Sequence, residues 1–115
     1  MIFTLELLIH GELLIIDKDI LLLSGSQSIY NIKLQIAAGS VWKHFEEINI
    51  ILKKGLLKYE FKLTAENDFT IMIPNELTKA PGHFTMGIYA EDNTGKVITS
   101  TTVTKKVNAG SMNLL

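Results

Sequence analysis

The sequence predicts an all-β protein of the sandwich type. Apolar and polar residues alternate along most of the chain from residue 28 onward, which is the pattern of strands with one buried face. Glycine, proline, asparagine and aspartate separate these runs at short intervals, as turns between strands require. No apolar pattern of helical period continues for ten or more residues. Short strands joined by turns, without long helices, are typical of a β-sandwich.

The chain has the size and composition of one folded domain. Its 115 residues are 47% hydrophobic and 20% charged, which favours a packed core over disorder. The net charge is -1 and all 11 basic residues are lysines, so the chain offers neither a basic surface nor an arginine fork to nucleic acid. The absence of cysteine excludes a disulfide framework and a thiol nucleophile. We expect no nucleic-acid partner.

Residues 1–23 are the most apolar segment and contain the first predicted strands. We expect two or three strands here, with breaks at His10-Gly11 and at residues 17–19. A secretory signal is not expected, because no positive residue precedes the apolar run, and Glu6 and Glu12 interrupt it. No stretch reaches the roughly 18 uninterrupted apolar residues of a membrane span. The sequence therefore predicts a protein made in a cytosol, without a membrane partner.

The first strand of this segment carries apolar residues on both of its faces. Ile2 and Leu8 lie on one predicted face, and a second apolar set lies on the other. A small sandwich has little material to cover both faces, so one of them needs a partner. We predict that residues 1–23 mediate self-association or docking, either face to face or by adding a strand to another sheet edge. The residues assigned to this interaction are Phe3, Leu5, Leu7, Ile9 and Trp42.

Residues 24–108 form the predicted sandwich module. The expected inward faces of its four main strands are Tyr30, Ile32, Leu34 and Ile36; Ile48, Ile50 and Leu52; Leu57, Tyr59, Phe61 and Leu63; and Phe84, Met86, Ile88 and Ala90. Gly55 allows a hairpin between the second and third of these strands. A shorter run at 69–73 ends at Pro74, which begins one helical turn with Leu77 facing inward. A hairpin then leads into a threonine-rich strand at 97–107, and residues 109–115 form a tail.

No group of residues has the spacing of a catalytic or metal-binding motif. His10, His44 and His83 are too far apart in sequence for a local ligand pair. The acidic residues at 17–19 and 91–92 lack the length and the oxygen count of a calcium loop. One glycine separates Ser24 from Ser26, whereas a nucleophile elbow has a glycine on both sides of its serine. We expect a protein that is not an enzyme and that uses neither a metal nor a cofactor.

Trp42, the single tryptophan, has two interpretations. If it is exposed beside Phe45, its ring offers a stacking platform for a sugar, as in a carbohydrate-binding or adhesin-like sandwich. If it is buried, it plugs the space between two sheets. The sequence leaves both open, so sugar binding is the alternative function.

An ordered set of short motifs between residues 28 and 108 carries a family resemblance. The motifs are Val41-Trp42 with Phe45, Ile73-Pro74 with Glu76-Leu77, the segment from Pro81 to Ala90, and the segment from Gly95 to Thr101. Together they resemble the immunoglobulin-like N-terminal modules of tail and baseplate proteins of phages that infect Gram-positive bacteria, including the baseplate upper protein type. The resemblance implies an immunoglobulin-like antiparallel sandwich, with residues 1–23 as an extra N-terminal strand or hairpin. It makes Pro74, Pro81 and Gly82 structural positions.

The same resemblance implies a role. It is that of a non-enzymatic structural component of a phage or prophage tail or baseplate, made in the cytoplasm of the bacterial host and incorporated into the virion. The expected partners are other tail or baseplate proteins and further copies of the chain itself.

Overall fold

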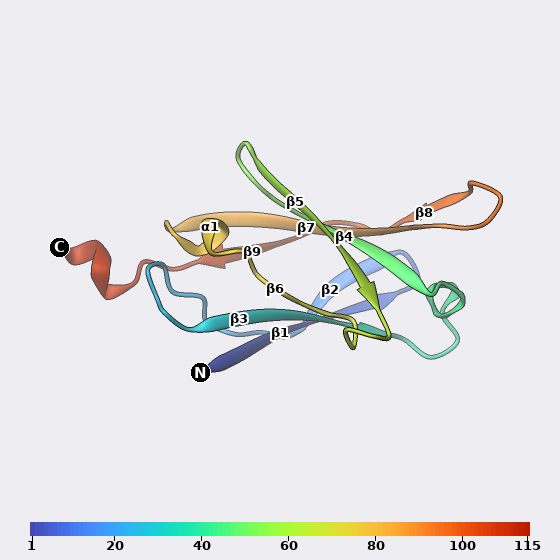
Figure 1. Ribbon diagram of the computed structural model, residues 1–115, viewed down its shortest axis with the longest axis horizontal. Coiled ribbons are helices and arrows are strands. Elements are labelled where there is room, and N and C mark those ends of the chain that lie inside the picture. The colour runs from blue at the N-terminus through green and yellow to red at the C-terminus, as the bar shows by residue number, and fades with distance from the viewer.

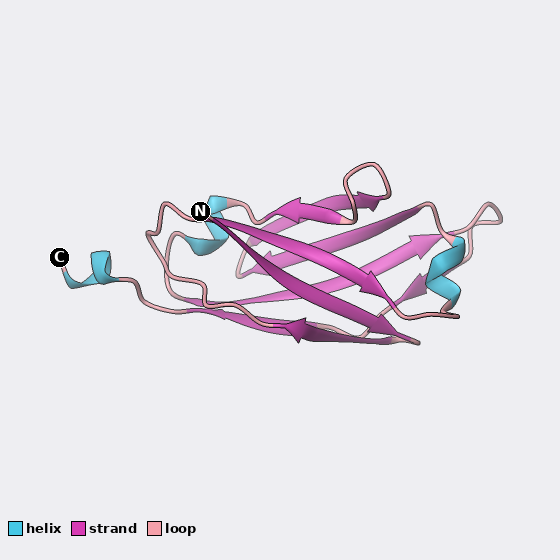
Figure 2. Cartoon of the chain, turned by 90° about the horizontal axis from the view of Figure 1, so that it is seen from below, coloured by secondary structure: helices cyan, strands magenta, loops and turns pink.

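Two β-sheets packed face to face make up most of the computed structural model, which describes residues 1–115. The molecule is elongated, with extents of 53 × 28 × 22 Å. The strands run between its two ends, where the short helical turns lie (Figure 2). Both chain termini lie at the end that also holds the helix α1 (Figure 1). The predicted β-sandwich architecture is confirmed at this level.

The first sheet has four strands in the order β2-β1-β3-β6, and the second has five, in the order β5-β4-β7-β8 with β9 also paired to β7. The strand bounds are β1 (Ile2–His10), β2 (Leu13–Lys18), β3 (Ile29–Ile36), β4 (Glu47–Lys54), β5 (Leu57–Thr64), β6 (Thr70–Met72), β7 (Gly82–Glu91), β8 (Val97–Thr99) and β9 (Val103–Val107). The helical elements are η1 (Val41–His44), α1 (Asn75–Thr78) and η2 (Ser111–Leu114).

Alternation along β3, β4 and β7 gives the core its two layers, as predicted. Every second residue of these strands is buried, except that Ile36 at the end of β3 is half-buried, and the buried sets of the two sheets pack against each other. The prediction for β5 is only partly correct, because Tyr59 and Phe61 are half-buried and Leu57 is exposed. β5 is an edge strand, and β6 in the other sheet has only three residues. The sandwich is therefore open along this flank.

The N-terminal strand occupies the interior of the four-stranded sheet. β1 pairs in antiparallel fashion with β2 on one side and in parallel with β3 on the other. Its inward residues Leu5, Leu7 and Ile9 have no exposed surface. Residues 1–18 thus contribute two of the four strands of this sheet, with β1 in its interior and β2 at its edge.

The turns follow the chemistry of their residues with one exception. Gly55 has a φ of 58°, which glycine adopts without strain, and it opens the predicted β4-β5 hairpin. Pro74 precedes α1, where Leu77 is fully buried as predicted. Phe69 was expected in a strand, but its φ of 51° places it in the preceding turn, so β6 begins at Thr70.

The threonine-rich run is two strands rather than the one predicted. Between β8 and β9, the chain turns from the five-stranded sheet toward the β1-β2 hairpin. The Thr101 amide donates to the Glu12 carbonyl at 2.8 Å, and the Thr101 hydroxyl accepts from the Leu14 amide at 3.1 Å. Lys105 and Asp19 form an ion pair of 2.7 Å farther along the same flank. These contacts join the two sheets along the β2 side.

Ser24 fixes the C-terminal segment. Its buried side chain accepts hydrogen bonds from the Gly110 amide, at 3.1 Å, and from the Asn113 side chain. A Cβ atom on Gly110 would lie 2.2 Å from the Ser24 carbonyl oxygen, so only glycine fits there. Ser24, which was considered above as a possible nucleophile, therefore has a structural role in holding the C-terminal segment.

Candidate interaction surface

The side of the four-stranded sheet that faces away from the core is the most distinctive surface of the molecule. We call it the outer face. It is formed by Ile2, Thr4, Glu6 and Leu8 of β1, Leu13, Ile15 and Lys18 of β2, Ile29, Asn31, Lys33 and Gln35 of β3, and Thr70 and Met72 of β6. No other element of the chain covers it, since the five-stranded sheet packs on the opposite side.

Apolar side chains occupy both ends of the outer face. At one end, Ile2 and Ile29 are register partners on β1 and β3, and Met72 lies beside them; their exposed fractions are 62%, 42% and 58%. At the other end, Leu8 pairs with Ile15, and Leu13 is exposed. Exposed aliphatic side chains concentrated on one sheet face are typical of a surface that contacts another molecule.

A row of charged side chains crosses the middle of the outer face. We call it the charged band: Lys18, Glu6, Lys33 and Asp68, in the order of the strands across the sheet, with Asp68 in the turn before β6. The Glu6 carboxylate lies 3.7 Å from the Lys18 ammonium and accepts a hydrogen bond of 2.9 Å from Gln35. Lys33 and Asp68 form an ion pair of 3.0 Å. The charges therefore alternate in sign from one edge of the sheet to the other.

The structure corrects the residues predicted for the interaction. Leu5, Leu7 and Ile9 are fully buried between the sheets, and Phe3 is 37% exposed and packs near Tyr30. Leu5, Leu7 and Ile9 complete the core and do not offer a surface to a partner, whereas Phe3 stays partly exposed near the start of β1. The apolar surplus predicted for β1 is present, but most of its exposed side chains lie on the opposite face, which begins with Ile2.

The alternation of residues along β1 does not show which of its faces is exposed, because both faces are apolar. The signal that identifies the outer face lies in the neighbouring strands, where Ile29 and Met72 interrupt otherwise polar outward sets. Register with β1 then brings these residues to the same surface as Ile2.

Trp42 belongs to the core as well. It is 1% exposed, and its indole nitrogen donates a hydrogen bond of 2.7 Å to the Gly11 carbonyl. The ring centre of Phe45 lies 6.4 Å away. Trp42 thus closes the end of the sandwich near η1, which is the buried interpretation, and its ring does not present a platform for a sugar.

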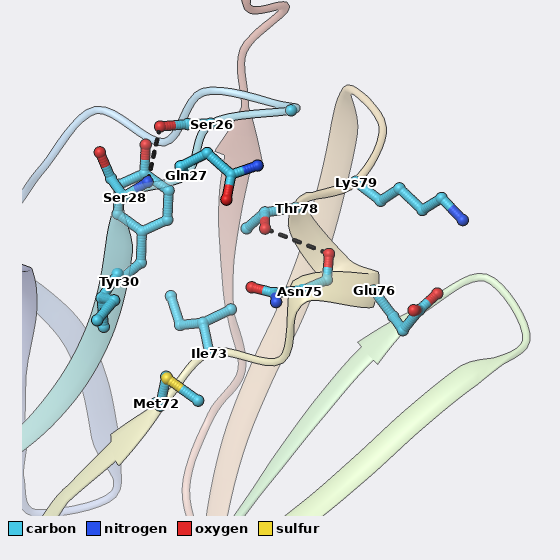
Figure 3. A pocket seen from close by; sticks show the side chains of 12 residues that line it. Ser26, Gln27, Ser28, Tyr30, Met72, Ile73, Asn75, Glu76, Thr78 and Lys79 are labelled. Atoms are coloured by element: carbon cyan, nitrogen blue, oxygen red, sulfur yellow. Dashed lines mark hydrogen bonds between the residues drawn. The ribbon is translucent and has the colours of Figure 1, made fainter.

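A hollow of about 330 Å³ lies between the loop that precedes β3 and the helix α1 (Figure 3). Two hydrogen bonds lie within it: Ser26 accepts from the Ser28 amide at 3.1 Å, and the Thr78 hydroxyl donates to the Asn75 carbonyl at 3.3 Å. Tyr30 and Ile73 form its apolar floor, as the close view shows.

A larger and shallower hollow, of about 820 Å³, lies at the other end of the molecule. Its lining includes His44 from η1 and acidic residues from β4 and the β7-β8 turn. Hydrogen bonds, chiefly from the Thr94 hydroxyl, lower the pKa of the carboxyl of Asp92, which also lines this hollow. These bonds hold the turn that follows β7. No group of three or more histidine, aspartate or glutamate side chains is arranged to hold a metal ion.

The other shifted pKa values have structural causes in separate parts of the fold. The hydrogen bond from Lys105 lowers the pKa of Asp19. Burial lowers the pKa of Lys54, whose ammonium group donates to the Leu77 carbonyl in α1 at 2.8 Å and to the Ala80 carbonyl after it at 2.6 Å. The hydrogen bond that Tyr89 donates to Glu60 raises the pKa of the tyrosine. These groups lie in separate parts of the fold and do not form a common site. The outer face, with its exposed aliphatic side chains, is therefore the candidate interaction surface.

Comparison with protein-family models, curated proteins and solved structures gives no match for this chain. No helix in the structure has the length and apolar character needed to cross a membrane.

Proposed function

We propose that the chain is a non-enzymatic structural component of a phage or prophage tail or baseplate, made in the bacterial host and incorporated into the virion through protein contacts of its outer face. The observation that carries the proposal is the exposed sheet face itself. The core is complete without it, because Leu5, Leu7 and Ile9 already fill the inner side of β1. The exposed aliphatic residues on the other side then have no role in the monomer, and a contact surface explains them.

The strand order supports the immunoglobulin-like part of the proposal. From β3 onward, β3 pairs with β6 in one sheet, and the other runs β5-β4-β7 followed by β8 and β9. The same relations hold between strands B and E, and among C′, C, F and G, of an immunoglobulin sandwich. The chain departs from that plan at its N-terminus, where β1 lies parallel to β3 and a second strand follows at the edge.

The electrostatics favour contact over chemistry. The four shifted pKa values each arise from a local contact or from burial, and the hydrogen bonds that the Ser26 and Thr78 hydroxyls make in the first hollow are to backbone groups rather than to a carboxylate or an imidazole. The alternative of sugar binding rested on an exposed Trp42, and that side chain is 1% exposed. No observation on the structure favours it, so protein contact is the function we retain.

Gold labelling of particles released from the host tests the role directly. Antibody against the chain is expected to decorate tails or baseplates in negative-stain micrographs. Ile29→Lys introduces a charge on the outer face and is expected to reduce incorporation, because burying an unpaired charge is costly. Val97→Lys is the matched control, since Val97 is 54% exposed at the start of β8 on the other sheet. Particles that never carry the label would refute the proposal.

A further inference from the structure

We propose that the partner of the outer face is a second copy of this chain, packed face to face about a two-fold axis that runs parallel to the strands. The inference rests on the proposed function in that it uses the same surface. It goes further because it identifies the partner as a second copy and specifies how the two copies are oriented. The main observation behind it is the charged band.

The sign order of the charged band selects the axis. Across the sheet from β2 to β6 the charges are positive, negative, positive and negative. A two-fold axis along the strands and centred between β1 and β3 places β1 opposite β3 of the second copy. Glu6 then faces Lys33 of the other copy, and Lys18 faces the Asp68 end of the band. Every charge meets one of opposite sign.

The other two-fold axis in the interface plane, perpendicular to the strands, gives the reverse result. It places each strand opposite itself, so Glu6 meets Glu6 and Lys33 meets Lys33. Like charges brought together in an interface are strongly unfavourable. Shifting the copies along the strands to avoid this would bury the charged band against the apolar ends, which is also unfavourable.

The apolar end that contains Ile2 agrees with the axis along the strands. Ile2 and Ile29 are register partners at one end of the sheet, so this axis places Ile2 of each copy opposite Ile29 of the other. The contact is isologous, as the interface of a two-fold dimer must be. Sheets that pack face to face in this way keep their strands nearly aligned, within about 30°.

The size of the face predicts a weak dimer. The strands β2, β1, β3 and β6 have 6, 9, 8 and 3 residues, and at about 4.8 Å between strands and about 3.3 Å per residue they give a footprint of roughly 400 Å². Stable interfaces commonly bury about 800 Å² per partner. We therefore expect a dissociation constant in the micromolar range, and multiple copies in an assembly would reinforce the contact.

Paired charge reversals test the geometry by sedimentation at concentrations up to a few hundred micromolar, on the order of the affinity expected. Glu6→Lys alone and Lys33→Glu alone are each expected to weaken dimerisation by about tenfold or more, because each places two like-charge pairs in the interface. An equimolar mixture of the two variants restores both contacts in the heterodimer. The double variant E6K/K33E restores them in a homodimer. Lys62→Glu, on the outer side of the five-stranded sheet, is the control and is expected to leave dimerisation unchanged.

Each other outcome overturns the inference. A wild-type chain that stays monomeric over this range rules out the second copy as the partner, while gold labelling still decides the proposed function independently. If the wild type dimerises but the equimolar mixture of the two variants does not, the proposed geometry is ruled out. Strong pairing of Glu6→Lys with the wild type indicates the axis perpendicular to the strands. Thermal melts of every variant separate loss of dimer from loss of fold.

Discussion

Removal of the Trp42 ring is expected to be among the most destabilising single changes in this chain. The side chain is 1% exposed, bonds to the Gly11 carbonyl at 2.7 Å and lies 6.4 Å from the Phe45 ring centre. An aromatic side chain buries about 150 to 250 Å², which at about 25 cal/mol per Å² corresponds to about 4 to 6 kcal/mol. Alanine keeps part of that surface, so we expect Trp42→Ala to lower the free energy of unfolding by about 3 to 5 kcal/mol.

Two further variants separate the contributions at this site. Trp42→Phe keeps most of the ring but removes the donor to Gly11, and because Gly11 lies in an exposed turn, water replaces that bond; the expected loss is about 1 to 2 kcal/mol. Val41→Ala, at a neighbouring residue that is 53% exposed, is the control and is expected to cost less than about 1 kcal/mol. Urea unfolding followed by circular dichroism measures all three without relying on tryptophan fluorescence. Equal losses for Trp42→Ala and Val41→Ala would refute the assignment of Trp42 as the plug of the sandwich.

Three other predictions follow from local contacts. Phe61→Ala is expected to cost about 1 to 3 kcal/mol in urea melts, less than a fully buried ring, because Phe61 lies on the open flank; a loss no larger than that of Lys62→Ala would mean that its ring is not packed. Gly110→Ala is expected to release residues 109–115 and to speed their amide exchange, and unchanged exchange would contradict the close contact at Gly110. The folded-state pKa of Asp19 lies below its ordinary value of 3.8, so its pair with Lys105 stabilises the fold above that pH and is lost as the pH falls through the lowered pKa. Stability of Asp19→Asn should therefore decline less steeply in acid, and acid melts with the same slope as the wild type would rule this out.

The strands of the sandwich were predictable wherever one face is clearly apolar. β3, β4 and β7 have apolar residues at alternate positions and polar residues between them, and their inward faces are those that alternation predicted. The short helix after Pro74 was also predictable, because proline ends the ladder and suits the first turn of a helix. In these segments the local sequence and the tertiary packing agree.

The interaction surface was predictable only in part. An apolar surplus in β1 was evident, but a strand with two apolar faces does not indicate which one the core will bury. The choice depends on the parallel pairing of β1 with β3 and on the turn of the chain at Thr101 toward β2, both of which join residues distant in sequence. The half-burial of Phe61 likewise reflects the three-residue length of β6 opposite it, rather than anything in β5 itself.

The accessibility of the outer face in released particles tests the central claim most directly. The chain has no cysteine, so one introduced thiol can be followed alone. Thr4→Cys places it between the apolar ends of the outer face, and Thr99→Cys places it on the outer side of the five-stranded sheet. We predict that the thiol at position 4 reacts with a maleimide much more slowly in particles than in the dilute free chain, while the thiol at position 99 changes little. Equal reaction rates at position 4 in both states would contradict the role of the outer face in assembly.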